Sequence, residues 1–338
     1  MINLSVIIPV YNGESYVTRC LTSIFSQTNF DFTFEVIAVN DGSKDNSLAL
    51  LNSIKESYRN LYIFDQNNGG AGSARNIGIN NAKGNFIWFI DADDYIQPNA
   101  FSVIQQFILK DDFCAATLGF NYYNVTSAGV LQPDKDSDHK DVEIFNGLEY
   151  VKQSSKKPYF LWVLIYNKKF IDIHNLRFIE GIKNLEDLEF SLRYFSTCAN
   201  IVYVNKRLYN YFENTSSTSR NSSLDNLNKL ACDSHVVHRS LYKIVCHNKQ
   251  TNDEICEVLN RSIVGFFYSL YKFNYSFSDL KSYYNKYKSE KLLPTKIINK
   301  NLKFAIFEFI VNAKYIYLAA SFIKKRIEFS LNDIFNTQ

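Results

Sequence analysis

Three aspartates follow a short apolar segment in the first third of the chain. Residues 86–90 read Phe-Ile-Trp-Phe-Ile, and Asp91, Asp93 and Asp94 come directly after them. An unbroken apolar segment of this length is typical of a strand that is buried on both faces of a parallel sheet. In extended backbone, residues two apart point to the same side, so the carboxylates of Asp91 and Asp93 are expected to converge. Such a pair suits Mg²⁺ or Mn²⁺, with phosphate oxygens and water as the remaining ligands.

The same acids have a simpler explanation as the solvated loop before a helix that opens near Pro98. A single Asp-x-Asp pattern fits both interpretations, because acidic loops often connect strands to helices. The choice between a metal site and a solvated loop therefore depends on the segments around the acids.

Composition and charge narrow the classes of protein. The chain has 338 residues, which indicates about two domains, and 46% of them are hydrophobic, enough for a substantial core. From Ser222 onward we count 17 Lys+Arg against 10 Asp+Glu, a net charge of +7, within a chain whose net charge is +3. This basic end is expected to contact an anionic membrane surface or a pyrophosphate-bearing substrate. Nucleic acid is disfavoured, because the sequence lacks zinc-finger spacing, an RNP motif and a dense arginine run.

Cysteine usage and the apolar segments indicate a cytoplasmic protein. The six cysteines form no C-x-x-C pair, and the chain begins directly with a strand-like segment. Residues 304–323 are apolar, but Glu308, Asn312 and Lys314 interrupt them. Charged and polar side chains in the middle of a membrane span cost free energy, so this pattern disfavours a span. We therefore expect a core or interfacial helix there, and a protein that is peripheral at the inner face of the cell membrane.

Strand-like and helix-like segments alternate along the first 110 residues, which predicts an α/β fold with a mostly parallel sheet between helices. The predicted strands are residues 4–11, 34–39, 61–64 and 86–90. We predict a first domain at residues 1–221 and a second region, which is only helix-like, at residues 222–338. The first domain is divided into two halves, residues 1–110 and residues 111–221.

Side chains suited to a nucleotide stand at three of the predicted strand ends. Tyr11 could stack on a base, Asp41 could accept hydrogen bonds from a base or ribose, and Asp91 and Asp93 could hold a metal on a pyrophosphate. The turn after the first strand is not G-x-G-x-x-G, and the glycine loop at 69–72 lacks the following Gly-Lys-Ser/Thr. These patterns disfavour a dinucleotide or P-loop site and favour a nucleoside diphosphate.

Four segments in order resemble the family 2 glycosyltransferases with the GT-A fold. They are Val-Ile-Ile-Pro-Val-Tyr-Asn at 6–12, Val-Asn-Asp-Gly-Ser at 39–43, Gly-Ala-Gly-Ser-Ala-Arg-Asn-Ile-Gly at 70–78, and Asp-Ala-Asp-Asp at 91–94. The resemblance covers residues 4–94 closely and continues more thinly to about residue 213. It implies a GT-A domain with a nucleotide-sugar donor, followed here by a helical C-terminal region.

The resemblance also implies roles for particular residues. Asp93 and Asp91 would bind Mn²⁺ or Mg²⁺. For Pro9 and Arg75 a structural alternative stays open: a strand-end proline, and an ion-pair partner of Asp94. The residues implied to bind the donor nucleotide are Pro9, Tyr11, Glu14, Asp41, Arg75 and Asp91.

The second half of the first domain resembles the family's acceptor side. Residues 160–162 are similar to the segment that precedes the acceptor site, so Trp162 and Asp94 are acceptor-side candidates. Glu186 and Asp187 open a predicted helix for which Asn184 is a plausible N-cap. Acids in a first helical turn complement the helix dipole, which is a sufficient structural reason for them. The resemblance implies that the pair supplies the catalytic base, with Asp187 favoured over Glu186.

The expected function is that of an inverting glycosyltransferase, which moves a sugar from a nucleotide donor to a hydroxyl of a glycan or lipid-linked glycan. We expect the donor to be a UDP-sugar. Surface polysaccharide synthesis, such as capsule or lipopolysaccharide, is the setting that the resemblance implies. One alternative is a nucleotidyltransferase, which would need a basic triphosphate loop near the N-terminus that the sequence lacks. The other is a non-catalytic glycan- or nucleotide-binding module, against which Asp91, Asp93 and Asp187 argue.

Overall fold

The computed structural model consists of two compact units, Met1–Ser222 and Ser223–Gln338. Within them the structure describes residues 2–110, 116–126, 129–130, 141–153, 159–197, 200–213, 224–247, 252–273, 275–296 and 302–313. The boundary drawn from the sequence lies between residues 221 and 222. The polar stretch 214–223 lies outside the described residues, as do residues 131–140.

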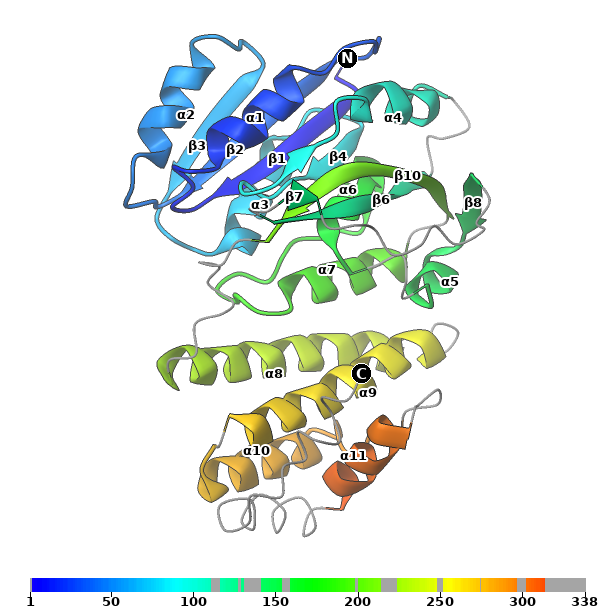
Figure 1. The fold of residues 1–338 in the computed structure, drawn as a ribbon. Helices are drawn as coiled ribbons and strands as arrows, with labels where there is room; N and C mark the ends of the chain where they lie inside the picture. Colours follow the sequence, from blue (N-terminus) through cyan, green and yellow to red (C-terminus); the bar gives the residue numbers. More distant parts are fainter. Residues whose placement is uncertain are drawn as a thin grey trace. The chain divides into compact units, whose positions relative to one another are not determined.

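The first unit is built on a sheet whose first four strands are all parallel (Figure 1). They lie in the order β3-β2-β1-β4. The strands β1, β2 and β4 are buried as their apolar sequences require, whereas the edge strand β3 is largely half-buried or exposed. This confirms the predicted α/β class. The strands are β1 (Leu4–Val10), β2 (Phe34–Asp41), β3 (Leu61–Gln66) and β4 (Phe86–Phe89).

Helices connect these strands and flank the sheet (Figure 1). The packing of α3 (Ala71–Asn81) explains why a glycine stands at position 78. A Cβ at Gly78 would lie 2.3 Å from the Ile7 side chain, so only glycine lets α3 pack so closely on β1. The helices are α1 (Val17–Phe25), α2 (Ser47–Lys55), α3 (Ala71–Asn81) and α4 (Ala100–Ile108).

Beyond β4 the sheet is mixed, and its order continues as β9-β6-β10-β5. β9 (Leu164–Asn167) runs antiparallel to β4 and to β6 (Ala116–Thr126), and β6 runs parallel to β10 (Asn200–Phe212). Two short strands, β5 (Tyr95–Ile96) and β8 (Val142–Phe145), pair antiparallel with β10. The two-residue strand β7 (Gly129–Val130) pairs with β6. The predicted parallel arrangement therefore holds for β1 to β4 and changes at β9.

Four short elements complete the first unit. They are α5 (Gly147–Val151), the 3₁₀ turn η3 (Leu161–Val163), α6 (Lys168–Ile173) and α7 (Glu186–Phe195). The predicted N-cap of α7 is wrong. The cap residue is Leu185 instead of Asn184, it has a left-handed φ of 62°, and it makes no side-chain capping bond. A left-handed leucine is strained, so tertiary contacts must hold the backbone that leads into Glu186 and Asp187.

The regular elements of the second unit, among its described residues, are all α-helices, as the sequence predicted. A buried histidine, His238, is bonded by Tyr287 Oη and Ser262 Oγ, each at 2.8 Å. None of the described helices has both the length and the apolar character that a membrane crossing requires. Contact with a membrane surface stays a prediction. The helices are α8 (Leu224–His247), α9 (Asn252–Lys272), α10 (Phe277–Ser289) and α11 (Leu302–Asn312).

Candidate active site

The acidic loop after β4 is a turn. Asp94 N donates a hydrogen bond of 3.1 Å to Asp91 O, which closes a four-residue turn around Asp93. Our expectation that extended backbone would align Asp91 and Asp93 is therefore wrong in its geometry. The turn still keeps both carboxylates in one short loop at the carboxyl end of β4.

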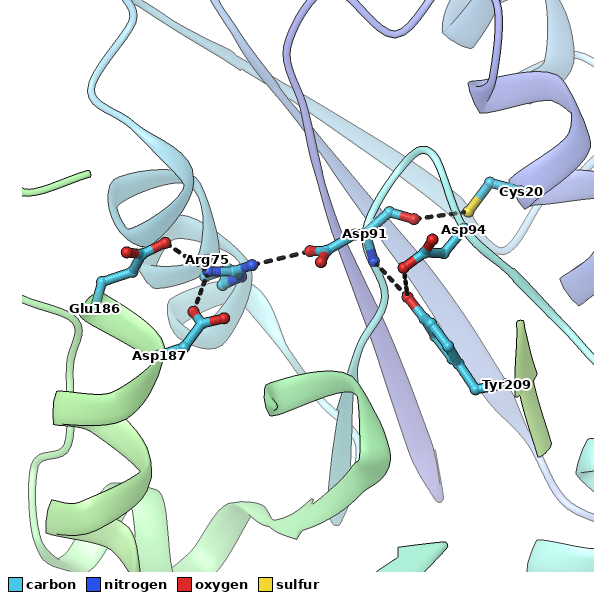
Figure 2. A network of polar contacts seen from close by, with 7 residues as sticks. All are labelled: Cys20, Arg75, Asp91, Asp94, Glu186, Asp187 and Tyr209. Carbon is cyan, nitrogen blue, oxygen red and sulfur yellow. Dashed lines mark hydrogen bonds and ion pairs between the residues drawn. The ribbon is translucent and has the colours of Figure 1, made fainter. Parts of the chain in front are cut away.

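Arg75 of α3 lies between that loop and α7 (Figure 2). Its Nη2 donates to Asp91 Oδ1 at 2.9 Å, and its Nη1 donates to Asp187 Oδ1 at 2.9 Å. Glu186 Oε1 lies 3.6 Å from the same Nη1. The arginine therefore joins Asp91 to Glu186 and Asp187, which lie more than 90 positions further along the sequence. The structure does not give Arg75 the alternative partner Asp94 that the sequence left open.

Arg75 is a permanently charged group in a buried position. Burial lowers the pKa of its guanidinium, but Asp187, Asp91 and Glu186 together raise that pKa well above its ordinary value. The side chains of Asp91 and Asp187 are 31% and 32% exposed, so one side of the cluster faces solvent. An arginine in this position neutralises the carboxylates and fixes their directions with its planar fork.

Asp187 has the properties of a tuned base. Burial raises the pKa of its carboxyl, Arg75 lowers it, and the negative charges of Glu186 and Asp91 raise it again, to about 8 in total. A carboxylate with a pKa near neutrality accepts a proton far more readily than an ordinary aspartate. Of the two acids that begin α7, Asp187 makes the shorter contact with Arg75 and carries this shift.

Asp94 has a different position from its neighbours in the loop. It is buried, its Oδ2 accepts from Tyr209 Oη at 2.7 Å, and its Oδ1 accepts from Phe212 N at 2.7 Å. Burial, with the charges of Asp91 and Asp93, raises the pKa of Asp94 well above its ordinary value. Tyr209 Oη also accepts from Asp91 N at 3.1 Å. Asp94 thus anchors the acidic loop to β10, and an acceptor contact stays a prediction.

Asp41 organises the glycine loop that precedes α3. Its Oδ1 accepts from Gly69 N at 2.7 Å and from Gln66 Nε2 at 2.6 Å, and its Oδ2 accepts from Gly70 N at 2.9 Å and from Asn68 Nδ2 at 3.2 Å. The carboxylate is buried. Its predicted contact with a base stays a prediction, and the structure adds a role in shaping the loop before α3.

The loop after β1 is held against the loop after β2. Glu14 Oε2 accepts from Asn46 N at 3.1 Å, and Asn12 N donates to Ser43 Oγ at 3.0 Å. Glu14 thus closes the start of α2, which gives it a structural role beside the predicted nucleotide contact. Pro9 is half-buried in β1, and Tyr11 is exposed after it, as stacking on a base requires.

Trp162 belongs to a stack of aromatic rings. Its ring is nearly parallel to those of Tyr209, Tyr211 and Phe160, with centroids at 4.6, 5.5 and 5.0 Å. Tyr122 meets Trp162 edge-on at 4.7 Å. Trp162 itself is buried, so its predicted role on the acceptor side would be to support a neighbouring ring that contacts the acceptor.

The acidic loop offers the kind of ligand that a divalent cation prefers, but too few such ligands to complete its coordination. Asp91 and Asp93 are hard oxygen donors, but one oxygen of Asp91 is already bonded to Arg75. Among the described residues no group of three or more metal-binding side chains comes together. Two protein ligands suffice for Mg²⁺ or Mn²⁺ only when substrate phosphate and water supply the rest.

Two side chains that support this loop were missed in the sequence. Tyr209 bonds Asp94 and Asp91 from β10, and Arg19 Nη2 donates to Asp93 O at 2.7 Å from α1. The Arg19 guanidinium lies over the rings of Tyr95 and Phe212, at 4.7 and 4.3 Å. Each is one of many tyrosines or arginines, and neither stands in a motif, so the sequence carries no signal for these contacts.

Known proteins resemble this chain over the same region. The family model "Glycosyl transferase family 2" matches residues 5–162. The chain is 28% identical over 220 residues to the uncharacterized glycosyltransferase YibD of Escherichia coli, covering 64% of this chain and 63% of that protein. It is 28% identical over 247 residues to the uncharacterized glycosyltransferase EpsJ of Bacillus subtilis, covering 72% and 70%.

A third relative is the Staphylococcus aureus poly(ribitol-phosphate) beta-N-acetylglucosaminyltransferase TarS. The chain is 29% identical to it over 216 residues, covering 62% of this chain and 35% of TarS. The crystal structure of TarS residues 1–349 in complex with UDP-GlcNAc matches with a TM-score of 0.71 at 21% identity, covering 96% of this chain and 92% of that one. This likeness establishes the GT-A fold. The family model, independently of that likeness, assigns residues 5–162 of this chain to glycosyl transferase family 2.

Proposed function

We propose that this protein is an inverting glycosyltransferase that uses a UDP-sugar and a divalent cation to extend a surface glycan. The observation that carries the proposal is the cluster in which Arg75 holds Asp91 and Asp187 together, each at 2.9 Å. Asp91 follows the strands whose ends carry the nucleotide candidates, and Asp187 begins a helix of the other half of the unit. A donor and an acceptor bound on the two sides would therefore meet at this cluster.

The choice of UDP-sugar and polysaccharide is supported by the relatives. TarS was crystallised with UDP-GlcNAc and with UDP, and its name describes transfer to poly(ribitol-phosphate). In this chain, Tyr11 is exposed directly after β1, the strand that pairs with β2, at whose end Asp41 lies, and an exposed ring there suits a stacked base.

The reaction that we propose is a single displacement. Asp187 accepts the proton of the acceptor hydroxyl while that oxygen forms a bond to the anomeric carbon, and the bond from that carbon to the nucleoside diphosphate breaks. Because the nucleophile enters opposite the leaving group, the anomeric configuration inverts. Arg75 orients Asp187 throughout the reaction. Its positive charge also offsets the repulsion between the carboxylates of Asp187 and Asp91.

The acidic loop would hold the cation. Asp93 and Asp91 are the residues that would bind it, while Arg19 and Tyr209 fix the backbone of their turn. When bound, a divalent cation supplies positive charge that stabilises the departing diphosphate.

Replacing Asp93 with alanine tests the donor site. We expect Asp93→Ala to lose the Mn²⁺-dependent part of UDP binding, measured by titration calorimetry with and without the metal. The matched control is Asp172→Ala, which removes an exposed aspartate paired only with Lys168 in the described structure, and it should bind UDP as the wild type does. If the mutant and the wild type bind UDP equally well in Mn²⁺, Asp93 is not a metal ligand.

Replacing Asp41 tests the glycine loop. Asp41→Ala leaves the amides of Gly69 and Gly70 without their acceptor, and each buried donor left unpaired costs about 1–3 kcal/mol. We therefore expect the free energy of unfolding to fall by at least about 2 kcal/mol in urea titrations. We also expect UDP to lose more affinity than pyrophosphate, because a base contact would be lost in addition. Asp31→Ala is the control, since Asp31 is an exposed aspartate of the same unit.

Unchanged stability of Asp41→Ala would show that the loop is held by other contacts. Equal loss of affinity for UDP and for pyrophosphate would assign Asp41 to the shape of the loop alone.

A further inference from the structure

A group of aromatic rings lies at the same edge of the sheet as the acidic loop. We call Tyr122, Phe160, Trp162 and Tyr211 the aromatic shelf. Tyr122 lies on β6 and Tyr211 on β10, while Phe160 directly precedes η3, which carries Trp162. Phe160 contacts both Trp162 and Tyr122, at ring centroid distances of 5.0 and 6.2 Å.

Strand direction places the shelf beside the acids. β9 is antiparallel to β4, with Trp88 opposite Ile165, so the residues just before β9 lie where β4 ends and Asp91 follows. β6 is antiparallel to β9, and β10 is parallel to β6, with Tyr209 opposite Tyr122. The later residues of β6 and β10 therefore reach the same edge.

The shelf lies on the opposite side of the acids from the nucleotide residues. In the strand order β3-β2-β1-β4-β9-β6-β10-β5, Tyr11 and Asp41 follow β1 and end β2, on one side of β4. The shelf belongs to β6, β10 and the start of β9, on the other side. A group bound there would approach the anomeric carbon from the side that the nucleotide leaves open.

Exposure falls along the stack toward the acids. Phe160 is 38% exposed, Trp162 is 5% exposed, and Tyr209 is fully buried. Tyr209 in turn bonds Asp94 and Asp91 N. A ring presented to solvent at this edge is thus supported by a rigid stack that ends in the acidic loop. A structural core alone does not require Phe160 to be exposed.

We propose that the aromatic shelf binds the acceptor glycan, with Phe160 as the ring that stacks on a sugar of the acceptor. The inference rests on the proposed function and adds the chemistry of the second substrate. A pyranose ring has an apolar face of C–H groups and a rim of hydroxyls, so it packs on an aromatic face while its rim stays solvated. Phe160 and Trp162, the two rings at the start of the shelf, carry no charge. A neutral sugar fits this surface better than an anionic group does.

Saturation-transfer NMR on the full chain with UDP and Mg²⁺ tests the proposal. The probes are methyl β-glucoside, methyl β-galactoside, methyl β-N-acetylglucosaminide and octyl β-glucoside. We expect ring C–H protons of at least one glycoside to receive saturation from the wild type. Phe160→Ala should weaken binding of that glycoside about 5-fold, because aromatic contacts contribute on the order of 1 kcal/mol beyond buried area.

Three further variants separate stacking from general damage. Phe160→Tyr keeps the ring and should keep the signal, whereas Phe160→Leu keeps an apolar side chain without the ring face and should lose it. Tyr62→Ala is the matched control, because Tyr62 is a 36% exposed aromatic residue on β3, and four strands separate β3 from β6 in the sheet order. Hydrolysis of UDP-sugars without an acceptor, measured on every variant, should be the same as in the wild type.

The outcomes distinguish this inference from the proposed function. Absence of UDP-sugar hydrolysis and UDP binding in the wild type would overturn the proposed function itself. With both present, the inference is overturned if no glycoside is bound, if Phe160→Ala binds as Tyr62→Ala does, or if Phe160→Tyr also loses binding. Saturation confined to the octyl chain would also overturn it, because the shelf would then bind lipid.

Discussion

Asp187→Asn should bind UDP as the wild type does and transfer sugar about 10²–10⁴ times more slowly. The asparagine keeps the size of the side chain and one oxygen that can accept from Arg75 Nη1, so the fold and the donor side are preserved. It cannot take a proton from the acceptor hydroxyl, and that step has no other carboxylate in the same position. The measurement compares kcat for transfer with UDP affinity in the same preparation.

Glu186→Gln is the matched control, because Glu186 precedes Asp187 on α7 and lies 3.6 Å from Arg75. Neighbouring residues on a helix point about 100° apart, so both cannot face the acceptor oxygen. We expect Glu186→Gln to retain most of the activity. An inactive Glu186→Gln beside an active Asp187→Asn would identify Glu186 as the base.

The pH profile gives a second control on the same residue. A general base must be ionised, and the pKa of Asp187 is raised to about 8, mainly by burial. Transfer by the wild type should therefore rise as pH increases toward about 8 and then level off, and a cation bound at Asp91 would move this rise to lower pH. The residual activity of Asp187→Asn should lack this rise.

Arg75→Met should destabilise the first unit and abolish efficient transfer together. Removing the buried guanidinium leaves Asp91 and Asp187 as close carboxylates without a counter-charge. Breaking a buried ion pair costs about 3–5 kcal/mol, and we expect about 3 because both partners are nearly a third exposed. Urea unfolding measures the loss. Lys168→Met, which breaks an exposed pair with Asp172, should cost at most about 0.5 kcal/mol.

The activity of Arg75→Met should also shift with pH. Arg75 lowers the pKa of Asp187, so its removal raises that pKa and moves the rise of activity to higher pH. Arg75→Lys should not restore the wild-type profile, because an ammonium lacks the fork that reaches Asp91 and Asp187 at once. Wild-type stability or an unshifted profile in Arg75→Met would show that the arginine does not hold the cluster.

Local patterns in the sequence determined much of the first unit. Apolar segments of strand length predicted β1, β2 and β4, because strands buried on both faces need no alternation, and a shorter apolar segment predicted the edge strand β3. Helical spacing predicted the helices between them, and their alternation implied a parallel sheet. The acids at 91–94 and at 186–187 were found because charged residues directly after an apolar segment or at a helix start stand out.

Tertiary structure alone decided how these residues act together. Arg75 bonds Asp91, 16 residues away, and Asp187, 112 residues away, and no local pattern records such pairs. The loop after β4 became a turn instead of a strand extension because Tyr209 and Phe212 of β10 bind Asp94 from more than 110 residues away. Leu185 adopts a left-handed φ that its own preference disfavours. At Arg75 and at the acidic loop, long-range contacts decided the arrangement, because buried charges and amides must find partners wherever the fold supplies them.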